Sequence, residues 1–300
     1  MHHRNIEKKQ VNIEFHADDY ALFPTQSHRI LDCRRNGNLS GVSVMPNSPH
    51  LRECFSDLYP FLGDVAVTVH LNLIEGKSLS DPEGGSSLTD SEGLLNCSFG
   101  SLLLRSCLPG RGALRRQLEE EIRAQIRVVQ GCLPEGIPLR LDGHAHYHMI
   151  PVVFDAMMDV IRKDSLNVSY IRIPREYLRL YLPHIRQLRD FSLINLVKVL
   201  ILNLLSVRNG LKYGSILRNL EQKIFLGVCL SGRMYYENVS VLMLDAVKLA
   251  EKKGKNLEIL AHPGGVFEQE DILQITSPDD RVFLTDDLRN REKSMFLINL

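Results

Sequence analysis

Pro138-Leu-Arg-Leu-Asp-Gly-His-Ala-His-Tyr-His-Met149 contains the strongest pattern in the chain. Pro138–Leu141 predicts a β-strand, and histidines follow it at alternate positions 144, 146 and 148. Alternate residues of an extended backbone point to one side, so we expect these imidazoles on a common face. Clustered neutral imidazoles suit metal ions, and the preceding Asp142 can orient a ligating ring. The stretch predicts a metal site at a strand end; a solvent-exposed histidine cluster is the alternative.

Short β-type runs alternate with helical patterns on both sides of this stretch. The predicted strands are Val11–Phe15, Gly41–Met45, Val65–His70, Pro138–Leu141, Val168–Ile173 and Leu257–Ala261. The predicted helices are Gln26–Asn36, Ala113–Gln130, Pro151–Lys163 and Val239–Lys253. This alternation predicts an α/β fold with a mainly parallel sheet, either open or closed into a barrel.

The 300 residues contain no Pro/Gly/Ser-rich linker that would divide them. We therefore expect a disordered extension over residues 1–10 and a single domain over residues 11–300. Residues 78–93 are rich in Ser, Gly and Asp, which predicts a long surface loop bordering the site.

The segment His184–Glu221 is predicted to be helical and either covers one side of the barrel or meets a second subunit. Its apolar part, Leu193–Val207, is interrupted by Asn195, Lys198 and Asn203. We interpret it as too short and too polar to span a bilayer, and as a buried or partner-facing helix.

Composition limits the classes of partner. Lys+Arg and Asp+Glu both number 36, so the formal net charge is zero, and no bulk charge favours nucleic acid or an anionic membrane.

The first ten residues lack the apolar region of a signal peptide. Six cysteines are scattered without a Cys-x-x-Cys motif, as expected for reduced thiols. These features predict a cytoplasmic location.

Three further motifs follow predicted strands. Asp18-Asp19 comes after Val11–Phe15, and adjacent carboxylates are costly to bury unless a cation compensates them; a surface turn is the alternative. His70 ends an apolar run, where a lone histidine is more often a satisfied core residue than a ligand. His262 precedes Pro-Gly-Gly, as either an acid–base group or a structural turn residue. Because the C-terminal ends of parallel strands gather on one face, all these motifs together predict an active site there.

With these motifs in place, the chain resembles the YdjC-like carbohydrate deacetylases, which include the chitooligosaccharide deacetylases. The resemblance rests on Ala-Asp-Asp-aromatic at 17–20, His70-x-Asn72-Leu73, Asp142-x-His144-x-His146-x-His148-Met149 and His262-Pro263-Gly264. Weaker similarities are Arg172–Glu176, Gly227–Met234 and Arg291-Glu292. Together they extend from about residue 11 to the C-terminus.

The resemblance implies a distorted (β/α) TIM-like barrel, a homodimer, and hydrolysis of acetamido groups on N-acetylated mono- or oligosaccharides with one divalent metal. It assigns Asp19, His70 and His144 as metal ligands, Asp18 as general base and His262 as general acid. Arg172 and Arg175 would shape the substrate pocket or hold Asp18 in place. His146 and His148 are left as residues that line the pocket or support the ligands.

This chemistry fits the residue types. A divalent cation lowers the pKa of water and polarises a carbonyl, Asp18 can accept the proton of the water, and His262 can protonate the departing amine. The resemblance implies Mg²⁺. Two imidazoles and one carboxylate suit Zn²⁺, Mn²⁺, Co²⁺ or Fe²⁺ better, because Mg²⁺ prefers oxygen ligands.

The chain departs from the family pattern at four positions. The family usually has Asn at His16, Phe at Tyr20, Gly at Ala21, and an aromatic residue at Gly265. The alternatives are a metal-dependent amidohydrolase, a phosphoesterase of the polymerase-and-histidinol-phosphatase type, or a non-catalytic sugar-binding barrel. The phosphoesterase type usually places His-x-His on its first strand, whereas this chain begins with Asp-Asp.

Overall fold

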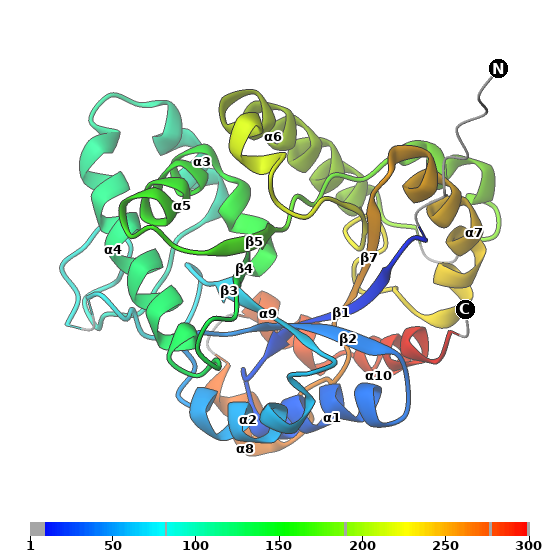
Figure 1. The fold of residues 1–300 in the computed structure, drawn as a ribbon. Coiled ribbons are helices and arrows are strands. Elements are labelled where there is room, and N and C mark those ends of the chain that lie inside the picture. The colour runs from blue at the N-terminus through cyan, green and yellow to red at the C-terminus, as the bar shows by residue number, and fades with distance from the viewer. Residues whose placement is uncertain (1–9, 82, 189–190, 276–277, 299–300) are drawn as a thin grey trace.

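A computed structural model describes residues 10–81, 83–188, 191–275 and 278–298. Seven strands form one sheet in the order β5-β4-β3-β2-β1-β7-β6, and every pairing is parallel (Figure 1). The strands are β1 Ile13–Tyr20, β2 Leu39–Val44, β3 Ala66–Leu71, β4 Leu139–Gly143, β5 Val168–Ile171, β6 Lys223–Leu226 and β7 Asn256–Ala261. Spatial order thus follows chain order around a barrel that is interrupted between β5 and β6.

The sheet curls into a half-barrel, and its two edge strands do not pair as a ladder. At the gap between β5 and β6 the backbone N–H of Glu221, just before β6, donates to the carbonyl of Ser169 in β5 at 2.9 Å. The expected distorted (β/α) barrel in a single α/β domain is therefore confirmed, with seven strands.

Helices surround the sheet (Figure 1). They are α1 Pro24–Arg35, α2 Leu51–Leu58, α3 Phe99–Cys107, α4 Arg111–Gln130, α5 Pro151–Lys163, α6 Leu193–Leu217, α7 Tyr236–Lys253, α8 Gln269–Gln274, α9 Pro278–Thr285 and α10 Leu288–Glu292. Short 3₁₀ turns are η1 Tyr59–Phe61, η2 His144–Met149, η3 Leu178–Leu180, η4 Leu182–His184 and η5 Lys293–Leu297. The α4 helix is typical of the helices around the sheet. Its buried residues Leu114, Leu118, Ile122 and Ile126 recur at four-residue spacing.

The two faces of the sheet differ in chemistry. Alternate residues facing the helices are apolar, such as Phe15 and Ala17 on β1 or Val67 and Val69 on β3, and they belong to the main core. Phe225 and Leu260, which pair with Glu258 and His16 across the sheet, are apolar inward residues. Most inward residues are polar or charged, and these are Glu14, His16, Asp18, Ser43, Thr68, His70, Arg140, Asp142, Tyr170, Arg172, Lys223 and Glu258. The barrel interior is thus a network of ionisable groups.

Most elements expected from the sequence are present, with ends shifted by a few residues, and Pro151–Lys163 is unchanged. The prediction missed β6, a four-residue strand next to the segment expected to be helical, as well as α2, α3 and the short helices after residue 268. Residues 78–93 contain no helix or strand in their described part, as expected, with isolated bridges at Lys77–Leu94 and Thr89–Leu95. The expected extension over residues 1–10 falls almost entirely outside the described residues.

The α6 helix is longer than the apolar stretch noted in the sequence. Its 25 residues make it long and apolar enough, by length and composition alone, to cross a bilayer, which corrects the expectation from Leu193–Val207. One third of its most apolar 18-residue stretch is buried within the domain. Asn195 donates to the carbonyl of Ser231 at 3.1 Å and Asn209 to that of Met149 at 2.9 Å, so polar contacts attach the helix to the barrel.

Candidate metal centre and active site

A bulge in β1 brings two neighbouring carboxylates to the same side of the strand. Successive strand residues normally point to opposite faces. Here the pairing of β1 with β2 shifts register between Ala17 and Tyr20, and Asp19 has φ 64°, in the left-handed region. Both carboxylates then approach His70 Nε2, Asp19 Oδ1 at 3.3 Å and Asp18 Oδ2 at 3.9 Å.

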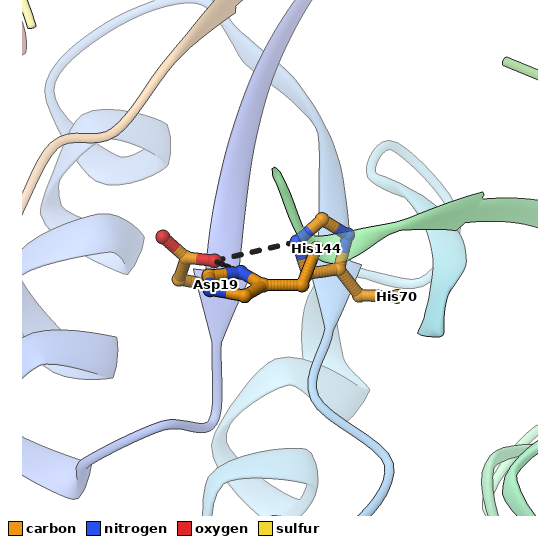
Figure 2. Close-up of side chains that lie close together, drawn as sticks. All are labelled: Asp19, His70 and His144. Atoms are coloured by element: carbon orange, nitrogen blue, oxygen red, sulfur yellow. Dashed lines mark hydrogen bonds and ion pairs between the residues drawn. The ribbon is translucent and has the colours of Figure 1, made fainter. Parts of the chain in front are cut away.

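Asp19, His70 and His144 converge from three strand ends (Figure 2). We call these residues the metal triad. Asp19 Oδ1 lies 2.9 Å from His144 Nδ1, and one ligand atom from each residue lies within 4.8 Å of the other two. Asp19 and His70 are buried, whereas His144 is partly exposed. The triad thus meets solvent on the side of His144.

Asp142 fixes the orientation of His70. Its Oδ1 accepts from His70 Nδ1 at 2.7 Å, while its Oδ2 contacts Ser43 Oγ and Arg172 Nη1, both at 2.5 Å. His70 Nε2 therefore faces Asp19 Oδ1 at 3.3 Å, and within the described part of the chain this buried nitrogen has no hydrogen-bond partner. A buried, unpartnered nitrogen beside a carboxylate and a second imidazole fits a divalent cation, because all three atoms are available as donors.

The histidine stretch is not extended, which corrects the expectation that its three rings share a face. Residues 144–149 form a 3₁₀ segment in which Ala145 and His146 have φ 46° and 60°. His144 reaches the triad, whereas His148 Nε2 contacts the carbonyl of Arg172 at 2.8 Å and His146 packs edge-on against Phe225. Burial lowers the pKa of His148 to about 4 and that of His146 well below 6.5, so both rings are neutral at neutral pH.

The metal triad holds protons in the absence of a cation. Burial opposes charging of both triad rings, yet Asp142 and then Asp18 raise the pKa of His70 to about 10. Asp19 raises the pKa of His144 to about 9. Although burial works against ionisation of Asp19, His144 and His70 hold its pKa well below the ordinary value. The site therefore carries two positive rings around one carboxylate, and a cation would replace their protons.

Arg172 holds Asp18 beside the triad. The Arg172 side chain is completely buried, and its Nη1 lies 2.9 Å from both carboxylate oxygens of Asp18. The same guanidinium contacts Asp142 at 2.5 Å and Glu258 at 2.7 Å. Arg172 thus holds the Asp18 carboxylate in place, and the domain encloses the guanidinium.

His262 follows β7 and lies partly buried at the same end of the barrel. Its backbone N–H donates to Glu292 Oε2 at 2.7 Å, and its ring packs edge-on against Phe283. Burial lowers the pKa of His262 below 6.5, while Asp19 and Asp18 favour its charged form. Its ring Nδ1 is buried and has no hydrogen-bond partner among the residues that the structure describes.

Arg175 lies elsewhere. It is exposed, and its guanidinium lies 5.6 Å from the Tyr177 ring. It borders a cavity of about 240 Å³ beside α6 and the gap between β5 and β6. None of Asp18, Asp19, His70, His144 and His262 lines that cavity. The structure thus brings the five acidic and histidine residues and Arg172 to one end of the barrel and leaves Arg175 outside.

A second group of metal-type ligands lies deeper in the barrel, and it was not expected from the sequence. Glu14, His16 and Glu258, here the inner cluster, also have ligand atoms within 4.8 Å of one another. His16 Nδ1 lies 2.8 Å from Glu14 Oε1, and His16 Nε2 lies 2.7 Å from Ser43 Oγ. A side chain at Gly41 would place its Cβ 2.4 Å from His16 Nδ1, so glycine leaves room for the cluster.

Cations already neutralise the inner cluster. Arg140 contacts Glu14 at 2.5 Å and Lys223 binds its other oxygen, while Arg172 and the Tyr170 hydroxyl bind Glu258. Charged residues within strand-forming runs, such as Glu258 in Leu257–Ala261, are the sequence signal that could have revealed it.

Asn72 organises the loop beside His144. Its side-chain oxygen accepts from the backbone N–H of Ile74 at 2.9 Å, and its amide donates to the carbonyl of Glu75 at 2.8 Å. This turn places Glu75 Oε1 3.8 Å from His144 Nε2. Asn72 belongs to a motif noted in the sequence, whereas the place of Glu75 beside the site was not expected.

Comparison with known sequences gives a family. The profile of the family described as YdjC-like protein matches residues 12–297. A carbohydrate deacetylase from Danio rerio is 27% identical over 171 residues, 57% of this chain and 52% of the relative. One from Thermoanaerobacter pseudethanolicus is 28% identical over 53% of this chain and 60% of its own length. A chitooligosaccharide deacetylase from Yersinia pestis is 30% identical, covering 52% of this chain and 58% of the relative. The alignments thus span only about half of these relatives.

One solved structure shares the fold over its full extent. It comes from Enterococcus faecalis and is described as a candidate cellobiose-phosphate cleavage protein. The TM-score is 0.59 at 17% sequence identity, and the match covers 97% of both chains. At this identity the match supports the architecture alone.

Proposed function

The chain belongs to the YdjC-like protein family, and we propose that it is a metal-dependent carbohydrate deacetylase that removes acetyl groups from N-acetylated sugars or oligosaccharides. The observation that carries this proposal is the metal triad with Asp18 beside it. One carboxylate and two imidazoles, one with an unpartnered buried nitrogen, lie next to a second carboxylate that Arg172 holds. This set supplies both a cation site and a base.

The side chains divide the work of amide hydrolysis. Asp19, His70 and His144 would hold a divalent cation, which would supply Lewis acidity toward water and the acetyl carbonyl. Asp18 accepts the proton of the attacking water, whose oxygen bonds to the acetyl carbon. His262 gives a proton to the sugar nitrogen as the carbon–nitrogen bond breaks, so the products are acetate and an amine.

His262 must be charged before it can act as an acid. Because burial lowers its pKa below 6.5, the ring is mostly neutral at neutral pH in the free protein. Asp19 and Asp18 favour the charged form, so they help His262 to take up the proton that it later donates. The Glu292 carboxylate accepts a hydrogen bond from the backbone N–H of His262 at 2.7 Å and so positions this residue.

The donor set favours a transition metal. Resemblance to the family suggests Mg²⁺, whereas two imidazoles and one carboxylate suit Zn²⁺ or another divalent transition metal better. We keep Mg²⁺ as the first cofactor to test and Zn²⁺ as its rival.

The cellular location, the substrate class and the assembly of the protein are also proposals. A reducing cytoplasm is supported by the six cysteines, all of which are free and four of which are buried. An N-acetylated mono- or oligosaccharide is the proposed partner, and a homodimer is the proposed assembly.

Acetate release from N-acetylglucosamine oligomers tests the function. The purified protein would be assayed with chelator, and then with Mg²⁺, Zn²⁺, Mn²⁺ or Co²⁺ added back. We expect chelator-sensitive release that one metal restores. Failure to release acetate with any metal, in protein that binds the metal, would overturn the deacetylase proposal and leave an amide or phosphoryl substrate of another class for the same site.

A further inference from the structure

The α6 helix is apolar on two opposite faces, and among the described residues only one of these faces has a partner. Its inner face packs on the barrel through buried residues such as Val199, Leu202 and Leu205. The helix lies at the edge of the molecule (Figure 1), and its opposite, outer face is exposed. The residues of this outer face are Leu193, Val197, Leu200, Leu204, Val207 and Leu211, here called the outer seam, and each is 47–84% exposed. A helix that is apolar all round normally packs on both sides.

The outer seam has the spacing of a coiled coil. Its residues are separated by four, three, four, three and four positions, which is the a/d pattern of a heptad repeat. Such spacing, near 3.5 residues per turn, keeps a seam facing another helix rather than drifting around the axis. A lipid surface does not require this regularity, so the pattern favours a helix as the occupant.

The outer seam is also self-complementary. In order, its residues are Leu, Val, Leu, Leu, Val and Leu, and both the spacing and the residue types are the same when read from the other end. An antiparallel copy of α6 would therefore pair Leu193 with Leu211, Val197 with Val207, and Leu200 with Leu204. Every layer then joins an a to a d position around a two-fold axis, as an isologous interface requires.

Charge favours this antiparallel arrangement. The α6 helix contains Lys198, Arg208 and Lys212 but no acidic residue, and no seam position is charged. Arg208 and Lys212 are paired with Asp155 at 2.8 Å inside the domain. In a parallel pair the two exposed Lys198 residues would lie at the same level. In the antiparallel pair they are separated by about 12 Å along the axis, since each residue rises about 1.5 Å.

We propose that the outer seam of α6 is a homodimer interface, in which α6 packs antiparallel against α6 of a second copy of this chain. The seam extends over about five helical turns, which is long enough to form the apolar core of an interface near the standard size of about 800 Å² per partner. The proposal does not depend on the catalytic assignment, because no seam residue belongs to the metal triad.

Mass measurement in solution tests the proposal, by sedimentation equilibrium of the complete 300-residue chain. We expect a dimer for the wild type. The variant Leu193→Glu/Leu211→Glu places like charges opposite each other in both end layers, and we expect its dissociation constant to rise by at least about 100-fold. Both positions are more than 70% exposed, so the fold should be unaffected, and circular dichroism would check this.

A charge-swapped variant, Leu193→Lys/Leu211→Glu, tests the orientation. An antiparallel pair brings the ammonium introduced at position 193 of each chain to the carboxylate introduced at position 211 of the other. We therefore expect affinity within about tenfold of the wild type. A parallel pair would instead oppose like charges. The matched control, Leu244→Glu/Leu273→Glu, changes leucines that are 64% and 70% exposed on α7 and α8, and it should remain dimeric.

Each contrary result has a definite meaning. A wild-type monomer, or a Glu/Glu variant that dimerises like the wild type, would overturn the interface. A Lys/Glu variant as weak as the Glu/Glu variant would overturn the antiparallel arrangement. A monomer that sediments with phosphatidylserine–phosphatidylcholine vesicles would assign the seam to a membrane surface and also overturn the proposal.

Discussion

The metal triad and the inner cluster are built from the same residue types, yet only one of them suits a cation. Each combines carboxylate and imidazole ligands within 4.8 Å of one another. Around the inner cluster, Arg140, Lys223 and Arg172 already neutralise Glu14 and Glu258. Among the described residues, Asp19 has ion pairs only with His70 and His144. The comparison teaches that permanent countercharge from Arg and Lys, in contrast to histidine rings that can give up their protons, distinguishes a structural ion network from a candidate metal site.

Asp19→Asn is the change that should separate the two clusters most. The amide loses the charge that draws a cation, and the Lewis acid contributes several kcal/mol, so turnover should fall by about 10³- to 10⁴-fold. Elemental analysis should show loss of metal in parallel with the rate. Full metal occupancy in this variant would remove the triad from consideration as the metal site.

Asp18→Asn should stop chemistry while sparing the metal. Loss of a general base typically lowers the rate by about 10²- to 10⁴-fold. Steady-state kinetics should show the change in kcat, and elemental analysis should show unchanged metal content. Loss of metal here would mean that the roles of Asp18 and Asp19 are exchanged.

Asp142→Asn tests whether the orientation of His70 matters. Asp142 lies 2.7 Å from His70 Nδ1, and loss of such a supporting group typically weakens metal affinity by about 10- to 100-fold. Competition with a chromogenic chelator would measure the affinity. Asp155→Asn is the matched control, because Asp155 is an ion-paired, buried carboxylate on α5 that pairs with Arg208 and Lys212 of α6 and with no residue of the triad. Equal losses in the two variants would point to a general effect on folding.

Proton competition predicts the pH dependence of metal binding. A cation needs neutral rings, whereas the pKa is raised to about 9 for His144 and about 10 for His70 in the metal-free protein. Affinity should therefore rise up to about tenfold per pH unit for each displaced proton, and level off above these values. Calorimetric titration in buffers of different ionisation enthalpy would count the protons. An affinity independent of pH between 6 and 9, as a rough window, would contradict the raised pKa values.

The same shifts determine the stability of the metal-free protein. A raised histidine pKa stabilises the folded state fully below the ordinary value of 6.5, and this contribution disappears as pH rises through the folded pKa. We expect the thermal unfolding midpoint of the metal-free protein to decline as pH rises above about 6.5, and the decline from these two rings to end near pH 9 for His144 and pH 10 for His70.

Glu14→Gln should have the smallest effect on metal and turnover. It removes one carboxylate from the inner cluster and leaves Arg140 and Lys223 undercompensated, which should lower the free energy of unfolding by about 3 kcal/mol. Urea denaturation would measure that loss, and elemental analysis should give wild-type metal content. Loss of metal with an intact fold would show that the inner cluster also binds a cation.

The sequence predicted the architecture and the strand-end placement of the site for a simple reason. Strand–helix alternation and apolar periodicity are local signals, and parallel topology then brings residues such as Asp19, His70 and His144 to one end. The missed strand, β6, has four residues, which is too short for a periodic pattern.

The details of the site depend on tertiary contacts and could not be predicted. The β1 bulge that turns Asp18 and Asp19 to one side arises from pairing with β2. The left-handed backbone at Ala145 and His146 overrides the alternation expected for residues 144, 146 and 148. The contacts of Arg172 with Asp18, Asp142 and Glu258 join four strand regions that lie far apart in the chain.

The backbone of Ala21, directly after β1, has an evolutionary consequence. This residue is fully buried with φ 73°, a conformation that costs an alanine roughly 1–2 kcal/mol and that glycine adopts freely. Alanine and glycine codons differ by one nucleotide, so a single mutational step can relieve that strain without touching any ligand. Lineages of this chain therefore have a nearby stabilising substitution in reserve, which could offset destabilising changes accumulated elsewhere while substrate preference drifts.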